Sequence, residues 1–249
     1  MFSFLKKPAP SAPSAIDELT FAIGDIHGRI DLFEKMLAEI RIDAASCVTK
    51  PRIVLLGDYI DRGPDSRGVI ERIIELGQSR WCDVIPLRGN HEQAMLDFLN
   101  DATGGPIWLS HGGLETLKSY GVARPLGNSD HEDWPEIQHA LLSCMGLKHF
   151  EFLTSLKAYY VQDDYLFVHA GVQPGLPLVE QTEKTLLWIR EPFLSAKKAA
   201  SRVVVHGHTP TPAAEDKTWR INVDTGAYAT GVLTAVRLEG TSRAFISVR

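Results

Sequence analysis

The chain has few of the features that mark secreted, membrane-spanning or nucleic-acid-binding proteins. Its three cysteines, Cys47, Cys82 and Cys144, are far apart and form neither a metal-ligand motif nor an even-numbered disulfide framework, which indicates a reducing compartment. No apolar run is long enough to cross a bilayer. The net charge of −5 gives no bulk attraction to nucleic acid. We therefore expect a cytoplasmic protein that binds neither membranes nor nucleic acid.

The sequence contains no internal repeat, and its 249 residues, 44% of them hydrophobic, can form one large domain. Residues 1–18 contain a Lys-Lys pair and a Pro/Ala/Ser-rich stretch and lack the apolar core of a signal peptide. We expect them to be a flexible tail before a domain spanning residues 19–249.

The first hundred residues alternate strand patterns with helix patterns. The expected order is strand 21–24, helix 30–41, strand 52–57, helix 66–77, strand 82–87 and helix 91–100. A β-α-β-α-β unit of this kind forms parallel strands through right-handed crossovers. Ligands of such sheets bind at the carboxyl ends of the strands.

Later segments predict a helical insertion and more strands. Glycine and proline interrupt short helical pieces in residues 101–150, which we interpret as a cap inserted into the domain. Strands are expected at 158–161 and 165–168, joined by a turn at Asp163-Asp164, and near 202–206, 219–223, 231–238 and 243–248, completing a second sheet. The predicted fold class is α/β, with two face-to-face mixed β-sheets flanked by helices.

Residues able to bind hard cations follow five of the expected strands. Asp25 and His27 share a face at the end of the first strand, and Asp58 can place one oxygen on each of two ions. Asn90, His169 and His208 follow three others. Two ions roughly 3.5–4 Å apart can activate water and polarise a phosphoryl group, so this set indicates a two-metal phosphoester hydrolase.

Each motif has a simpler interpretation when it is considered alone. Asn90 can be a helix N-cap, His169 can be a packed histidine, and Asp61 can be a turn residue. The joint occurrence of ligand chemistry at five strand ends is hard to obtain by accident, which favours the metal site.

Three motifs resemble signatures of a known family. Gly-Asp-x-His-Gly at 24–28, Gly-Asp-x-x-Asp-Arg-Gly at 57–63 and Leu-Arg-Gly-Asn-His-Glu at 87–92 resemble those of the calcineurin-like metallophosphoesterases. Within that family they are similar to the phosphoprotein phosphatase branch, which includes bacterial Ser/Thr protein phosphatases and symmetrical diadenosine tetraphosphatases. Thr209 and Pro210 follow His208 where other branches have a second histidine. The resemblance spans about residues 20–237.

The resemblance implies a role for each matching residue. It implies one ion on Asp25, His27 and Asp58, and a second ion on Asp58, Asn90, His169 and His208. Manganese is the expected metal, with iron or zinc as alternatives. Other implied roles are general acid for His91, orientation of His91 for Asp61, and phosphate binding for Arg62, Arg88, Asn90 and Arg190. For Arg190, a surface ion pair with Glu191 is the competing interpretation.

The substrate stays open because these motifs bind only the phosphoryl group. The leading hypothesis is a manganese-dependent phosphatase of phosphoserine and phosphothreonine in proteins, acting in one step through a metal-bound hydroxide. The alternative is a bis(5'-nucleosyl)-tetraphosphatase, which hydrolyses dinucleoside polyphosphates. Trp108, Trp134 and Trp188 are available to stack a base in that case. A third hypothesis is a metal-binding scaffold without catalysis, against which the His91 and Asp61 pair argues.

Overall fold

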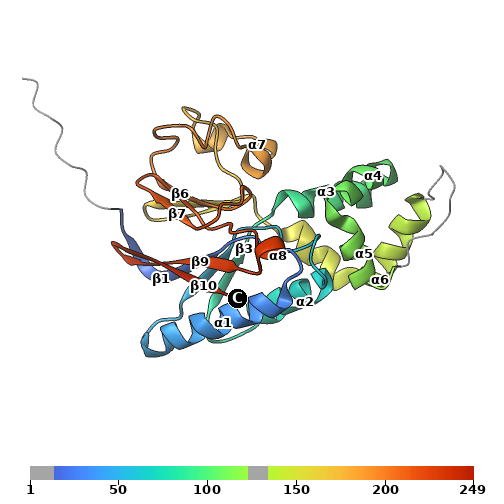
Figure 1. Cartoon of the computed structure of the whole chain (residues 1–249), viewed down its shortest axis with the longest axis horizontal. Helices are drawn as coiled ribbons and strands as arrows, with labels where there is room; N and C mark the ends of the chain where they lie inside the picture. Colours follow the sequence, from blue (N-terminus) through green and yellow to red (C-terminus); the bar gives the residue numbers. More distant parts are fainter. Residues whose placement is uncertain (1–13, 123–133) are drawn as a thin grey trace, which may run out of the picture.

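Two five-stranded sheets lie face to face, with helices on the outer side of each (Figure 1). This computed structural model describes residues 14–122 and 134–249. Part of the expected tail and of the cap, residues 1–13 and 123–133, therefore lies outside the described residues. The tail was predicted to extend to residue 18, but the first strand already begins at Ile16, whose side chain is buried between the sheets.

The first sheet contains the predicted β-α-β-α-β unit. The parallel strands β1 (Ile16–Ile23), β2 (Arg52–Leu55) and β3 (Asp83–Pro86) are connected by α1 (Ile30–Asp43) and α2 (Ser66–Gly77). The antiparallel strands β9 (Leu233–Gly240) and β10 (Ser242–Val248) extend it on the other side of β1. Their assignment to the second sheet was wrong, because local alternation does not specify which strand is the partner.

The second sheet has the strand order β4-β5-β6-β8-β7. Its strands are β4 (Tyr159–Gln162), β5 (Tyr165–Val168), β6 (Val203–His206), β7 (Glu215–Lys217) and β8 (Arg220–Asn222). The predicted turn joins β4 to β5, and Asp163 has a positive φ of 51° there. The short edge strand β7 is polar and has no apolar alternation that could have predicted it.

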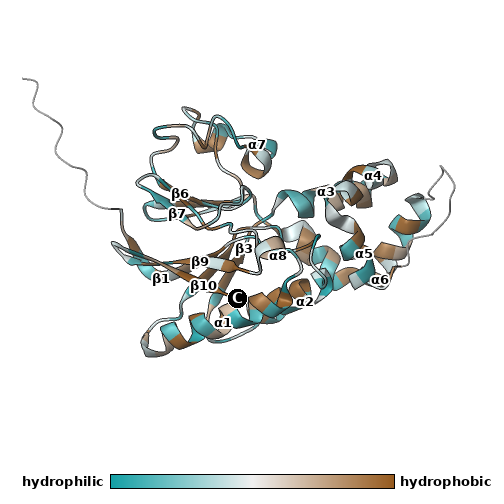
Figure 2. Cartoon of the chain, in the orientation of Figure 1, coloured by the Kyte–Doolittle hydropathy of each residue, from teal (hydrophilic) through white to brown (hydrophobic). Residues whose placement is uncertain are grey.

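Alternate residues of each central strand enter different cores. In β2, Val54 points between the sheets, whereas Ile53 and Leu55 point toward the helices. In β5, Phe167 joins the core between the sheets and Leu166 packs toward α7 (Glu183–Trp188). Brown apolar residues accordingly follow the strands and the inner sides of the helices in Figure 2. Burial on both faces explains why these strands are continuous apolar runs.

Helix α2 shows how the sequence sets the bounds of an element. The Asp65 side chain caps it by accepting a hydrogen bond from Gly68 N at 2.7 Å. Val69, Ile73 and Leu76 form its buried side, and the helix ends at Gly77, as predicted. This places the 57–63 loop, which precedes the helix, at the edge of the sheet.

Helices also pack beside one end of the sandwich (Figure 1). They are α3 (Asn90–Asn100), α4 (Gly105–Trp108), a π-helical turn (Leu109–Gly113), α5 (Leu114–Ser119) and α6 (Trp134–Ser155). The short helix α8 (Ala227–Thr230) lies across the ends of the sheets. No helix in the described part of the chain is both long and apolar enough to cross a membrane.

Candidate metal centre

The loops that follow the strands adopt an uncommon backbone conformation. Six non-glycine residues in the described chain have a positive φ, and five of them, the exception being Asp163, come from the predicted motifs: His27, Asp58, Asp61, Arg62 and His208. Such residues cost free energy and cluster at functional sites. The strain therefore coincides with the predicted site.

Asp58 lies between two groups of histidines. Its Oδ2 atom is 3.5 Å from Nε2 of His27, and its Oδ1 atom is 3.4 Å from Nε2 of His169. All three side chains are buried. One carboxylate thus presents a different oxygen to each group, which is the arrangement that bridging two cations requires.

In the first group, the ring of His27 is oriented by the backbone. Its Nδ1 atom donates to the carbonyl of Ile60 at 2.7 Å, which leaves the Nε2 lone pair directed at Asp58 and Arg62. Nε2 of His91 lies 3.8 Å from Asp58 Oδ2. The guanidinium of Arg62 donates to Nε2 of both His27 and His91, so a positive group already contacts this cluster.

In the second group, two imidazole rings meet one amide oxygen. His169 Nδ1 donates to the carbonyl of Leu56 at 2.9 Å, so its Nε2 presents a lone pair to Asn90 Oδ1 at 2.8 Å. Nδ1 of His208 lies 2.8 Å from the same oxygen. Burial lowers the pKa of both histidines, to about 3 for His208, which favours the neutral rings that bind metal ions. Two imidazole nitrogens and an amide oxygen beside Asp58 fit one divalent cation.

Asp25 borders these groups and faces a carboxylate that the sequence did not point out. Burial, followed by the charges of Asp224 and Asp58, raises the pKa of Asp25 well above its ordinary value. Burial also raises the pKa of Asp224 to about 6. The backbone N–H of His208 donates to both Asp25 oxygens at 3.2 Å. Crowded buried carboxylates of this kind favour a bound cation.

His91 and Asp61 form a buried pair beside Asp58. Nδ1 of His91 lies 2.7 Å from Asp61 Oδ2. Burial lowers the pKa of His91, but the negative charges of Asp58 and Asp61 outweigh burial, and the net shift is upward. The pair is therefore suited to hold a proton on the ring.

Glu92 supports the same loops, although the sequence analysis gave it no role. Its side chain accepts from the backbone N–H groups of Asp58, Tyr59 and Gly89, at 2.8, 2.8 and 2.9 Å. A Cβ atom on Gly89 would lie 2.2 Å from Asp58 Oδ1, so only glycine fits there. The signal was present in the sequence, because glutamate at the third position of a helix commonly completes a capping box.

Arg88 lies elsewhere, which corrects its expected role in phosphate binding. Its guanidinium donates to the backbone carbonyls of Thr154 and Leu156 at the end of α6, and to the side chains of Gln93 and Glu183. The Arg88 side chain therefore links α3 to α6 and α7. The contact with α6 is favourable because the free carbonyls at a helix C-terminus attract a cation.

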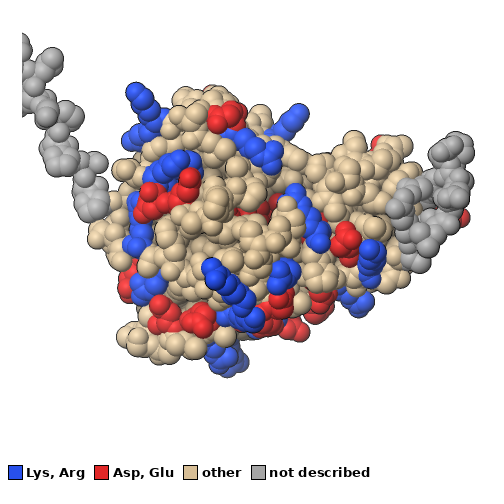
Figure 3. Space-filling model, viewed as in Figure 1, with Lys and Arg blue, Asp and Glu red and all other residues tan. Residues whose placement is uncertain are grey.

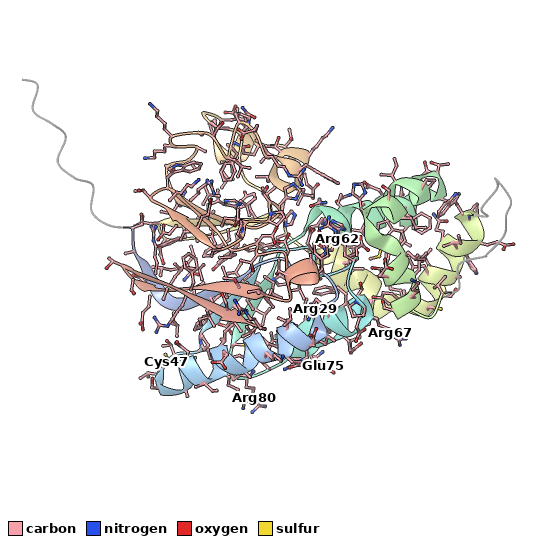
Figure 4. All side chains as sticks on the ribbon, viewed as in Figure 1. Arg29, Cys47, Arg62, Arg67, Glu75 and Arg80 are labelled. Carbon is pink, nitrogen blue, oxygen red and sulfur yellow. The ribbon has the colours of Figure 1, made fainter. Side chains whose placement is uncertain are left out.

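Several other side chains surround the cluster. Tyr228 lies over Arg62, with its ring centre 4.7 Å from the guanidinium carbon. His111 has its ring centre 6.0 Å from that of His91. Trp188 is 36% exposed and contacts His111 and His208, and the charge of Arg190 acts on His169 and His208. Figure 4 shows Arg62 where the stacked sheets meet the cap helices.

His206 is buried away from this cluster. Its Nδ1 atom contacts the carbonyl of Gly207, and its Nε2 atom lies 3.2 Å from a guanidinium nitrogen of Arg220. Burial lowers its pKa to about 3. His206 is therefore a buried residue of the second sheet whose nitrogen atoms are directed away from Asp58.

Comparison with known proteins identifies the class. The family model of the calcineurin-like phosphoesterases matches residues 20–231. The fold is similar to the solved structure of a metallophosphoesterase from Sphaerobacter thermophilus, with a TM-score of 0.53, 17% identity and coverage of 94% of this chain and 89% of that one. The chain therefore belongs to the calcineurin-like phosphoesterases, a family of dinuclear metal-dependent hydrolases that act on phosphoester bonds.

Relatives within the family carry two kinds of name. Serine/threonine-protein phosphatase 1 of Salmonella typhimurium is 29% identical over 88% of this chain and 91% of its own length. An asymmetrical bis(5'-nucleosyl)-tetraphosphatase of Oceanobacillus iheyensis is 26% identical over 91% of this chain and 90% of its own. The symmetrical enzyme of Nitrosomonas europaea is 31% identical over 63% of this chain, and that match covers 46% of the relative.

Proposed function

We propose that this protein is a manganese-dependent phosphomonoesterase that prefers phosphoserine and phosphothreonine in proteins. The observation that carries the proposal is the buried pair of His91 and Asp61 directly beside Asp58. Alkoxide leaving groups are poor, so phosphomonoester hydrolysis benefits from a proton donor positioned at the leaving oxygen.

The proposed ligands divide into two sets that share Asp58. Asp25 and His27 complete the first, and Asn90, His169 and His208 complete the second. When bound, the ions activate water and polarise the phosphoryl group. The mixture of imidazole, carboxylate and amide oxygen suits manganese, and iron and zinc accept overlapping ligands.

His91 is also close enough to His27 and Asp58 to hold an ion with them. We assign it instead as the proton donor. Its Nδ1–H is committed to Asp61, and the upward shift of its pKa favours the protonated ring. In this assignment the substrate phosphate takes over the Arg62 hydrogen bond, Nε2 of His91 is then protonated, and it gives that proton to the leaving oxygen, while the Asp61 charge stabilises the imidazolium until then.

Two arginines are proposed to bind the phosphoryl oxygens. Arg62 already contacts the rings of His27 and His91, and the charge of Arg190 acts on His169 and His208. Asn90 is the third proposed contact, through its amide nitrogen. Planar guanidinium groups match phosphate oxygens in pairs.

The charge around the site supports a single phosphoryl group as the part that is recognised. The two described cap lysines that could reach a longer phosphate chain are paired with carboxylates, Lys118 with Glu115 and Lys148 with Glu71. Positive and negative side chains are interspersed over the face seen in Figure 3. The nearly full-length match to a serine/threonine-protein phosphatase agrees with this preference.

The second candidate is hydrolysis of dinucleoside polyphosphates, which the tetraphosphatase relatives favour. Trp188 is exposed beside His208 and can stack a base, whereas Trp108 is fully buried and cannot. A comparison of kcat/KM for a phosphoserine peptide and for diadenosine tetraphosphate, at the same manganese concentration and pH, tests the choice. We expect the larger value for the peptide. A clearly larger value for the dinucleotide would replace the first proposal with the second.

A further inference from the structure

The carboxylate of Asp61 is held by two side chains of the cap in addition to His91. The indole Nε1–H of Trp108 donates to Asp61 Oδ2 at 3.1 Å, and the hydroxyl of Thr116 donates to Oδ1 at 2.6 Å. Asp61, Trp108 and Thr116 each have 0% of their surface exposed. Both oxygens of the carboxylate are thus fixed by donors that water does not replace.

The hydroxyl network around Thr116 has one consistent direction. A threonine hydroxyl has a single hydrogen, and that of Thr116 is used on Asp61 Oδ1. The hydroxyl of Ser66, 2.9 Å away, must then donate to Thr116. The backbone N–H of Asp61 is shared between these two hydroxyl oxygens. The Thr116 hydroxyl therefore donates to the carboxylate and stabilises its charge, against burial, which raises the pKa of Asp61 above its ordinary value.

The segment between Trp108 and Thr116 contacts the backbone of the loop that contains Asp61 and Arg62. Its π-helical turn contains Gly112, whose φ is 105° and whose carbonyl accepts the backbone N–H of Arg62 at 3.1 Å. A Cβ atom on Gly112 would lie 2.9 Å from Arg62 N, so the close approach requires glycine. Phe98 stacks on Trp108 at 5.2 Å and fixes its ring.

We infer that the cap is part of the proton-donating machinery: Trp108 and Thr116 are positioning residues that hold Asp61 charged and oriented toward His91. This inference rests on the proposed role of His91 as general acid. A carboxylate that loses one of its donors stabilises its charge less well and turns more freely, so the imidazole it holds becomes a poorer donor. The cap is then needed for the chemical step and not only for shaping an entrance.

The test uses variants that each remove one donor: Thr116→Val keeps the side-chain volume, and the smaller ring of Trp108→Phe is matched by the same change in the control. Trp108→Phe removes the indole N–H, and Thr116→Val removes the hydroxyl. Thr116→Ser keeps the hydroxyl and should therefore retain wild-type activity. Trp134→Phe is the matched control, because its ring also packs on Phe98 and no contact between Trp134 and Asp61 exists among the described residues.

Each variant is assayed with manganese on a phosphoserine peptide and on p-nitrophenyl phosphate. Trp108→Phe and Thr116→Val should lower kcat on the peptide roughly 10-fold to 100-fold, the usual effect of one hydrogen bond to a charged group. The loss on the aryl ester should be much smaller, because that leaving group needs less protonation. KM and metal content should stay near wild type. Equal losses on both substrates, or no loss on the peptide, would overturn the inference.

A second measurement does not depend on activity. In the chelated protein, the proton on Nδ1 of His91 should give a far-downfield NMR signal that exchanges slowly with water. The signal should move or exchange several-fold faster in Trp108→Phe and Thr116→Val, and should be retained in Thr116→Ser and Trp134→Phe. A signal that is the same in all variants refutes the positioning role. A wild-type enzyme inactive on every phosphoester would instead refute the proposed function, and the NMR comparison would still decide the inference.

Discussion

The ring of His91 is joined to the carboxylate of Asp61 by a 2.7 Å hydrogen bond, and both side chains are almost completely buried. The same histidine donates its backbone N–H to Oδ1 of Asp58 at 3.1 Å. His91, the proposed proton donor at the start of α3, is thus hydrogen-bonded to Asp58, the carboxylate proposed to bridge two ions. This relationship distinguishes a site built for hydrolysis from one that only binds metal.

Replacement of His91 tests the assigned acid. His91→Asn should lower kcat on a phosphoserine peptide by roughly 10²–10⁴, the usual effect of losing a positioned acid. The loss on p-nitrophenyl phosphate should be smaller, and the metal content should stay near two ions per chain. His139→Asn, a substitution in the cap outside the site, is the control. Loss of an ion from the His91 variant, measured by elemental analysis, would make His91 a ligand instead.

Removal of the bridging charge tests the two-ion arrangement. Chelation should abolish activity and manganese should restore it. Asp58→Asn should lower occupancy by both ions together, because the two oxygens of Asp58 face different histidine groups. Asp97→Asn is the matched control, because that carboxylate lies on α3 and accepts a hydrogen bond from the side chain of Gln93. If fully chelated protein retains its activity, the two-metal proposal is wrong.

The motifs at the strand ends were predictable because local chemistry and local periodicity coincide there. Asp25, Asp58 and Asn90 each follow an apolar strand, and the parallel order of β1, β2 and β3 brings them to one edge. The partner of β1 on its other side was not predictable. It is β9, more than two hundred residues away, and nothing in the alternation of either strand selects the other.

The support of the site depends on contacts that have no local signal. Trp108 is 47 positions from Asp61, and it carries no mark in the sequence that separates it from a core tryptophan. Arg88 is the reverse case, because its sequence motif suggested a role that its contacts do not support. Its place in a phosphate-binding motif suggested the substrate, but its side chain turns toward the carbonyl ends of α6. Direction is set by packing, and a motif gives only the position along the chain.

The proton held by Asp224 should contribute stability to the metal-free protein that is lost as the pH rises. Burial and the charge of Asp58 raise the pKa of Asp224 to about 6 from an ordinary value of 3.8, so the folded state holds this proton more tightly than the unfolded chain does. The stabilisation is complete below about pH 4 and is lost as the pH passes 6. The loss is on the order of 2–3 kcal/mol.

Denaturant unfolding of chelated protein at pH 5 and pH 8 measures this effect. The free energy of unfolding of wild type minus that of Asp224→Asn, which cannot ionise, should fall from pH 5 to pH 8, because the contributions of the buried histidines are common to both proteins and cancel. An identical pH dependence in the variant and in wild type would show that Asp224 does not carry the shift.

Two arginines of neighbouring motifs should respond differently to the same substitution. Arg62 contacts the rings of His27 and His91, so Arg62→Ala should lower kcat/KM on a phosphoserine peptide by about 10²-fold, the effect of losing a charged group that stabilises the transition state. Arg88 instead binds the backbone carbonyls of Thr154 and Leu156. Arg88→Ala should therefore lower the free energy of unfolding by about 1–3 kcal/mol, because buried carbonyls lose their donors, while kcat/KM at a temperature where the protein is folded changes less than about three-fold. Steady-state kinetics and denaturant unfolding of both variants separate the two roles. A fall in kcat/KM for Arg88→Ala as large as that for Arg62→Ala, with stability unchanged, would return Arg88 to the phosphate site.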